Sequence, residues 1–164
     1  MKVSDILEVD SIELHLKATR KRELLHEMIQ LLHGTHPISN VNEVERELIK
    51  RETVASTGIG DGIAIPHLLT SGVTTTMMAI GIKQGGIKYS SIDGNPVQLV
   101  FLIVGPQGQE PQHLRLLCGL SRLLRDARTK SRLLAAQTRE EIKNLVSEFE
   151  DRQSHECYPQ MENN

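Results

Sequence analysis

The sequence predicts one domain of the α/β class, built around a mixed sheet. Three observations lead to this prediction. The chain has 164 residues, which is the size of one ordinary globular domain with a single core. Short apolar runs typical of strands alternate with longer segments whose apolar residues recur every three or four positions, as in helices. No internal repeat or low-complexity linker divides the chain.

Composition and charge argue against several classes of function. A formal net charge of -2 gives no reason to expect nucleic acid or an anionic membrane as partner. Aromatic residues make up 2% of the chain, which argues against sites that stack bases or sugars. No apolar run approaches the ~20 residues of a membrane span, and the first ten residues carry acids where a signal peptide is basic. Two cysteines are too few for a disulfide scaffold, so we expect a cytoplasmic protein.

The first third of the chain predicts a turn, a strand and two helices, in that order. Residues 4–9 suit a short capped turn, and residues 11–16 alternate between polar and apolar as in a half-buried strand, with His15 facing solvent. A helix is expected from residues 19 to 33, where a glycine follows. A second helix is expected at residues 41–52 behind an asparagine cap.

Three apolar runs in the middle of the chain predict strands. Residues 63–65 read as a short buried strand, after which a loop is expected beyond His67. Residues 74–83 form the second run. Residues 96–104 are the most apolar segment and should lie at the centre of the sheet, because a strand buried on both faces carries few polar residues.

The last third of the chain predicts helices. Glu110 can cap a helix with Pro111 at its first position, and a leucine-rich stretch follows in which Cys118 is expected to be buried. A further helix is expected after Asp126. A capping box at residues 138–141 opens the last helix, which runs to Phe149. The chain then becomes polar without periodicity, as in a frayed tail.

Three glycines stand out in the run STGIGDGIAIPH at residues 56–67. Gly58, Gly60 and Gly62 lie at every second position and let the backbone approach another surface closely. The run lacks the Gly-Lys-Ser/Thr of a Walker A loop, and its position between a helix and a strand reverses the order that a dinucleotide fingerprint needs. We therefore expect the glycines to form a bare surface where a partner docks.

His67 ends this run, directly behind a proline that stiffens the exit from the strand. A lone histidine can be a metal ligand, an acid–base group, a nucleophile or a structural residue. No HxxxH or HxH spacing and no cysteine beside a histidine supports a metal site, and no GxSxG elbow supports a serine nucleophile. We expect neither a metal nor a cofactor. The other roles stay open.

Several short motifs together resemble one protein family. Arg51-Glu52, the run at 56–67 and Gln112-His113-Leu114 are similar to the type 2 (fructose/mannitol) enzyme IIA domain of the bacterial sugar phosphotransferase system. The resemblance covers residues 1–150 and leaves 151–164 as a polar C-terminal tail. It implies an α/β sandwich with a mixed, mostly parallel sheet flanked by helices. It also implies a phosphotransferase with a phosphohistidine intermediate.

The resemblance assigns three site residues. His67 would accept a phosphoryl group from HPr or an HPr-like carrier as tele-phosphohistidine, and pass it to an enzyme IIB domain. His113 would support the transfer from the start of its helix, and the planar fork of Arg51 would stabilise the phosphoryl charge. From the residues alone, Arg51 fits a solvated helix end better, and His113 fits a leucine stripe equally well.

The resemblance leaves two functions open. The first is sugar uptake, which allows peripheral association with a membrane permease. The alternative is a stand-alone nitrogen-regulatory protein, in which phosphorylation of His67 controls binding to regulatory targets; the lack of a fused IIB or IIC domain mildly favours it. A metal-dependent hydrolase is a third hypothesis, for which we expect no bound zinc.

One departure from the family pattern follows the histidine. Many members have a glycine or another small residue there, whereas this chain has Leu68-Leu69. We expect an exposed leucine pair, which would alter the docking surface and so bear on which partner is recognised.

Overall fold

In the computed structural model, which describes residues 1–156, six strands form one mixed sheet. Its order is β1-β5-β6-β3-β2, with β4 also paired to β6. Three pairings are parallel (β1–β5, β3–β6 and β4–β6), and two are antiparallel (β5–β6 and β2–β3). The strands are β1 (Leu7–Glu13), β2 (Gly58–Gly60), β3 (Ile63–Ala64), β4 (His67–Thr70), β5 (Met77–Ile87) and β6 (Val97–Pro106).

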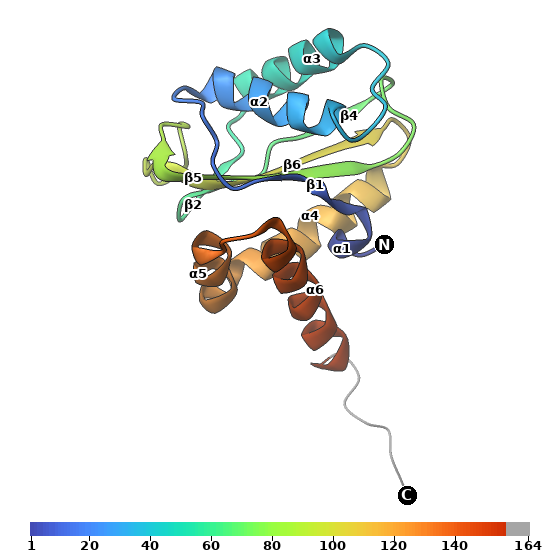
Figure 1. The fold of residues 1–164 in the computed structure, drawn as a ribbon. Coiled ribbons are helices and arrows are strands. Elements are labelled where there is room, and N and C mark those ends of the chain that lie inside the picture. Colours follow the sequence, from blue (N-terminus) through green and yellow to red (C-terminus); the bar gives the residue numbers. More distant parts are fainter. Residues whose placement is uncertain (157–164) are drawn as a thin grey trace, which may run out of the picture.

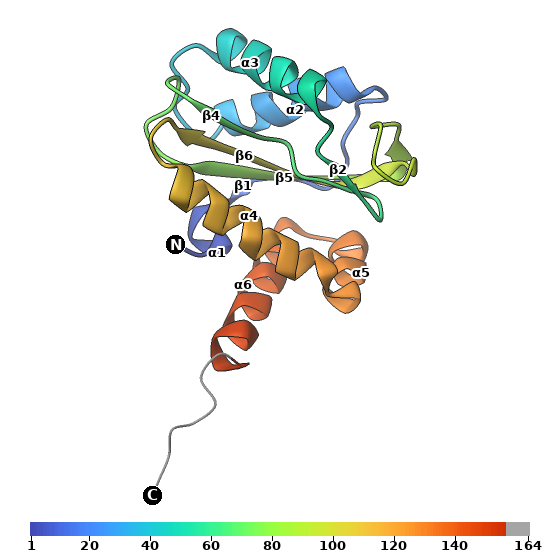
Figure 2. The same cartoon turned by 180° about the vertical axis from the view of Figure 1, so that it is seen from behind.

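Helices cover both faces of the sheet, which confirms the predicted α/β sandwich (Figure 1). One layer holds α2 (Lys21–His33) and α3 (Val41–Val54). The opposite layer holds α1 (Val3–Ile6), α4 (Glu110–Arg125), α5 (Ala127–Ala135) and α6 (Arg139–Glu156). Seen from behind, α4 runs beneath the strands from the end of β6 (Figure 2).

Strand β6 divides the core into two halves. Its side chains alternate between the faces: those at Leu99 and Ile103 pack with α4, α5 and α6, and those at Val100 and Val104 pack with α2 and α3. All four side chains are fully buried. Burial on both faces explains why this segment reads as a continuous apolar run rather than an alternating one.

The first strand differs from its prediction. β1 begins at Leu7 and ends at Glu13, whereas a strand was expected at residues 11–16. Its register against β5 shifts between Leu7 and Ile12, so two successive residues, Ser11 and Ile12, are both buried. The irregularity hides the alternation on which the prediction relied. His15 follows the strand and is exposed, as expected.

The prediction of a loop directly after His67 is wrong. Residues 67–70 form β4, which lies parallel to β6 and pairs His67 with Ile103. Pro66 separates β4 from β3, because proline has no N–H to donate to a ladder. The prediction that the leucine pair is exposed is also wrong, since Leu68 and Leu69 are half-buried within β4.

The C-terminal helices correct two further expectations. Cys118 is exposed, because the buried stripe of α4 runs through Leu116 and Leu120 on the other side of the helix. α6 does not end at Phe149 but continues to Glu156. Glu150 stabilises this extension by accepting the Val3 and Ser4 amides of α1 at 2.9 and 2.7 Å. Residues 157–164 of the expected tail lie outside the described residues.

The glycine run is not a bare surface. Gly58, Gly60 and Gly62 are all buried, and the first two pack against the loop around Ser91 and Asp93. Gly60 and Gly62 have φ angles of +96° and +77°, the left-handed region that glycine favours. Gly58 and Gly60 therefore belong to β2, and Gly62 lies in the tight turn between β2 and β3.

Gly58→Ala should destabilise the fold by about 1–3 kcal/mol, the usual cost of overpacking. A Cβ at this position would lie 2.5 Å from Ser91 Oγ and 2.9 Å from Ser91 Cα. Gly85→Ala is the matched control, because a Cβ there meets nothing within 4 Å. Urea unfolding measures both variants; equal stabilities would contradict the close packing at Gly58.

Candidate functional site

His67 is held at the start of β4 by a hydrogen bond to its own chain. Its Nδ1 lies 2.7 Å from the carbonyl oxygen of Ile65, two residues earlier. Because a carbonyl oxygen only accepts hydrogen bonds, Nδ1 carries the proton. In the neutral ring, Nε2 therefore keeps its lone pair. The histidine is only partly buried.

His113 lies beside His67. The two ring centroids are 5.4 Å apart and the rings are tilted by 50°. His113 is the fourth residue of α4, which begins at Glu110 behind the N-cap residue Gln109, one residue earlier than predicted. Its side chain faces the interior, as its place in the leucine stripe predicts, and it is 7% exposed. Neither ring nitrogen has a hydrogen-bond partner among the described residues.

Burial keeps His113 neutral. Burial is the largest cause and the neighbouring His67 the next, and together they lower the pKa of this imidazole to about 4, although Glu110 acts in the opposite direction. At neutral pH the ring therefore has one N–H donor and one acceptor nitrogen. A buried donor without a partner is uncommon in proteins and calls for an explanation. An acceptor on His67 would supply one.

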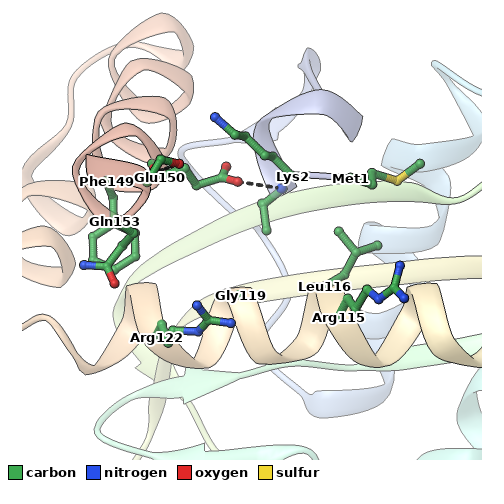
Figure 3. Close-up of a pocket in the computed structure, with 11 residues that line it drawn as sticks. Met1, Lys2, Arg115, Leu116, Gly119, Arg122, Phe149, Glu150 and Gln153 are labelled. Atoms are coloured by element: carbon green, nitrogen blue, oxygen red, sulfur yellow. Dashed lines mark hydrogen bonds between the residues drawn. The ribbon is translucent and has the colours of Figure 1, made fainter. Parts of the chain in front are cut away.

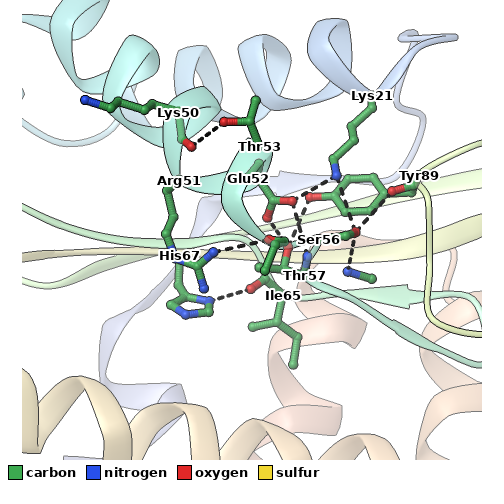
Figure 4. Close-up of polar contacts among 12 residues, drawn as sticks. Lys21, Lys50, Arg51, Glu52, Thr53, Ser56, Thr57, Ile65, His67 and Tyr89 are labelled. Carbon is green, nitrogen blue, oxygen red and sulfur yellow. Dashed lines mark hydrogen bonds and ion pairs between the residues drawn. The ribbon is translucent and has the colours of Figure 1, made fainter.

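Arg51 comes from the last turn of α3 and points toward His67 (Figure 4). Its Nη1 donates to the carbonyl oxygen of Ala55 at 3.2 Å. No acidic side chain among residues 1–156 forms an ion pair with it. An unneutralised planar guanidinium is suited to bind an anion such as a phosphoryl group.

A network that the sequence analysis did not assign lies behind these residues. Glu52, beside Arg51, is 5% exposed and forms an ion pair of 3.0 Å with Lys21. It accepts the amide of Thr57 at 3.2 Å and, in a short contact, its hydroxyl. In the sequence, Glu52 stands in the Arg51-Glu52 pair and Thr57 in the run at 56–67. Thr57 could be expected to donate a hydrogen bond or to form a turn, and Glu52 received no role. We call the side chains of Lys21, Glu52, Thr57 and Tyr89 the Glu52 network.

Several grooves lie away from His67. One of about 420 Å³ runs between α1, α4 and α6 and is lined by Lys2, Arg115 and Arg122 among others (Figure 3). His67 is not among the residues that line this groove. Within residues 1–156, no group of three His, Cys, Asp or Glu side chains is placed to hold a metal ion. No helix of this part is long and apolar enough to cross a membrane.

Two adjacent histidines, of which the buried His113 is neutral, lie near an unneutralised arginine, and this arrangement suits the binding of a phosphoryl group. The family described as "Phosphoenolpyruvate-dependent sugar phosphotransferase system, EIIA 2" matches residues 5–149. The chain belongs to this family, whose members take part in phosphoryl transfer. The resemblance in sequence is thereby confirmed.

Two curated relatives represent two branches of the family. The chain is 32% identical over 150 residues to the fructose-specific EIIABC component of Bacillus subtilis, which covers 92% of this chain but only 24% of that protein. The chain thus spans about a quarter of this relative's length. It is 30% identical over 133 residues to the nitrogen regulatory protein of Pseudomonas aeruginosa, covering 81% of this chain and 86% of that protein.

Solved structures share the fold. The crystal structure of nitrogen regulatory protein IIA-Ntr from Neisseria meningitidis superposes with a TM-score of 0.82 and 27% identity, covering 88% of this chain and 98% of that one. Mannitol enzyme IIA from Escherichia coli, in its complex with phosphorylated enzyme IIB, has a TM-score of 0.74 and 21% identity. That match covers 87% of this chain and 97% of the mannitol protein. In that complex, the mannitol enzyme IIA is bound to its enzyme IIB.

The buried neutral His113 should make stability depend on pH. Its pKa in the fold, about 4, lies below the ordinary 6.5, so the unfolded chain binds the proton first as pH falls. The stabilisation is complete above the ordinary pKa and is lost as pH falls toward 4. Between pH of about 7.5 and about 5, the wild type should lose about 2 kcal/mol more than His113→Phe.

Urea titrations at both pH values measure this difference. The exposed His15 is the control, since His15→Phe should keep the wild-type pH dependence. A His113→Phe variant that loses as much stability as the wild type would show that His113 does not titrate as described.

Proposed function

We propose that the chain is a phosphocarrier that accepts a phosphoryl group on Nε2 of His67 from the phosphohistidine of HPr or an HPr-like protein. The observation that carries this proposal is the hydrogen bond from His67 Nδ1 to the Ile65 carbonyl oxygen. In the neutral form of the ring, this bond holds one nitrogen and leaves the other free to attack, which a nucleophilic histidine needs.

In the proposed step, the lone pair of His67 Nε2 forms the new N–P bond while the N–P bond of the donor histidine breaks. The leaving nitrogen takes back the electron pair. The Nδ1 proton stays on His67, and the Ile65 carbonyl oxygen stabilises the positive charge that the ring gains. The neutral His113 would donate its N–H to a phosphoryl oxygen, and Arg51 would offset the phosphoryl charge.

Within the family, we propose that the chain acts as a regulatory enzyme IIA, whose targets distinguish phosphorylated from unphosphorylated His67. The matches to nitrogen regulatory proteins support this branch, because they extend over most of those proteins' own length and include a TM-score of 0.82. Such a protein would work in the cytoplasm, where its carrier and targets are expected.

Sugar uptake is the second candidate, favoured by the 32% identity to a fructose-specific component. In that role the chain would pass the phosphoryl group to an enzyme IIB domain and associate peripherally with a membrane permease. The partners then differ, but the reaction at His67 is the same.

His67→Ala should abolish phosphorylation. Incubation with phosphoenolpyruvate, enzyme I and HPr should label the wild type with an acid-labile, alkali-stable adduct. The exposed His33 provides a matched control, because His33→Ala should label fully. A His67→Ala variant that is still labelled would refute the assigned acceptor.

Arg51→Ala and His113→Ala should each slow the transfer roughly 100-fold without removing the acceptor, as loss of one charge-stabilising donor usually does. Rapid-quench measurement of labelling with phosphorylated HPr gives these rates. Full-rate transfer in both variants would eliminate their proposed roles.

The two branches differ in what deletion of the gene does. A regulatory protein predicts normal growth on fructose and mannitol, together with a partner whose binding differs between His67→Ala and the phosphate-mimicking His67→Asp. Pull-down with both variants identifies such a partner. Loss of growth on one sugar, with transfer to its enzyme IIB, would instead support uptake.

A further inference from the structure

A buried carboxylate next to Arg51 has no part in the transfer step described above. The Glu52 side chain is only 3% exposed, and both of its oxygens are occupied. Oε2 bonds Lys21 and the Thr57 amide, and Oε1 accepts the Thr57 hydroxyl. Figure 4 shows these contacts converging on the turn after α3. A charge buried this deeply is tolerated only when it is paired, so Glu52 is a fixed anchor for Thr57.

Two hydrogen bonds lead from Thr57 to the imidazole of His67. The carbonyl oxygen of Thr57 accepts the N–H of Ile65 at 3.0 Å. The carbonyl oxygen of Ile65 in turn accepts Nδ1–H of His67 at 2.7 Å. Ile65 is thus held through its amide and orients the ring through its carbonyl group. A shift of Thr57 would be passed to the ring by this route.

The same carboxylate holds the segment to which Arg51 bonds. Arg51 Nη1 donates to the carbonyl oxygen of Ala55 at 3.2 Å. Ala55 lies in the short turn whose two ends, Glu52 and Thr57, are joined by their hydrogen bonds. The position of the guanidinium is therefore linked to the same anchor as the imidazole.

Lys21 and Tyr89, from other parts of the chain, complete the Glu52 network. Lys21 Nζ lies 4.2 Å above the centre of the Tyr89 ring and 3.3 Å from Ser56 Oγ. The Tyr89 hydroxyl lies 3.2 Å from Thr57 Oγ1, and it donates because the Thr57 proton is committed to the carboxylate. Burial and the charge of Glu52 raise the pKa of Tyr89, which keeps this donor protonated.

We propose that Glu52 is a positioning residue for His67: by holding Thr57 and, through it, Ile65, it keeps the imidazole as the Nδ1–H tautomer with Nε2 free. Glu52 touches no reacting atom and acts entirely through Thr57. The consequence for phosphoryl transfer rests on the function proposed above. The effect on the tautomer does not, because it needs no partner.

Nitrogen-15 NMR of the histidine rings in the full chain, at a pH where they are neutral, tests the tautomer directly. Thr57→Val removes the hydroxyl with little change of shape, and Thr57→Ser restores it. Glu52→Gln removes the charge. Thr53→Val is the matched control, since the hydroxyl of this exposed threonine of α3 donates to the Lys50 carbonyl oxygen and to no other atom that the described residues offer.

The wild type, Thr57→Ser and Thr53→Val should show His67 as the Nδ1–H tautomer. Thr57→Val and Glu52→Gln should show a raised population of the Nε2–H tautomer. If His67 has the same tautomer in Thr57→Val as in the wild type, the proposal is overturned. If Glu52→Gln does not fold, the comparison of Thr57→Val with Thr57→Ser still tests the proposal, because both of these variants keep the buried ion pair between Glu52 and Lys21.

Phosphoryl transfer from HPr gives the second readout. Thr57→Val should lower kcat by up to about 100-fold with little change in KM, as expected when a nucleophile is misplaced rather than a docking surface altered. Thr57→Ser should recover most of the rate. An increase in KM alone would contradict a positioning role. A wild type that accepts nothing from HPr would refute the proposed function and leave the tautomer result unaffected.

Discussion

The hydrogen bond between His67 Nδ1 and the Ile65 carbonyl oxygen, 2.7 Å long, depends on how three short strands follow one another. β2 and β3 form a tight hairpin, and Pro66 then interrupts the edge of the sheet before β4 begins. The Pro66 carbonyl oxygen accepts the Ile103 amide of the central strand at 3.0 Å. The backbone next to His67 is therefore fixed, and the bond from the Ile65 amide to the Thr57 carbonyl oxygen holds the residue to which the ring bonds.

Electrostatics then complement this geometry. His113 is buried and stays neutral, so it can donate a hydrogen bond without repelling a neighbouring imidazole. Arg51 provides a permanent positive charge that no acid among the described residues neutralises. Glu52, the neighbouring residue, is in contrast fully paired and buried. The end of α3 thus holds one charge available to a ligand and one committed to the fold.

The regular parts of the fold could be predicted from the sequence, and the irregular parts could not. The central run at 96–104 and the helix at 19–33 follow periodic patterns and lie within a residue or two of β6 and α2. β4 was missed because its four residues carry no pattern and pair only with β6. The burial of Glu52 depends on Lys21 and Tyr89, contacts from distant parts of the chain that no local pattern reveals.

The proposed transfer requires that Nε2 of His67 carries the phosphoryl group. Phosphorus–nitrogen correlation NMR on the nitrogen-15-labelled chain, phosphorylated by HPr, determines this directly. Because Nδ1 of His67 is held by the Ile65 carbonyl oxygen, we expect a single N–P bond, at Nε2 of His67. An N–P bond at Nδ1 of this residue, or at His113, would contradict His67 Nε2 as the acceptor.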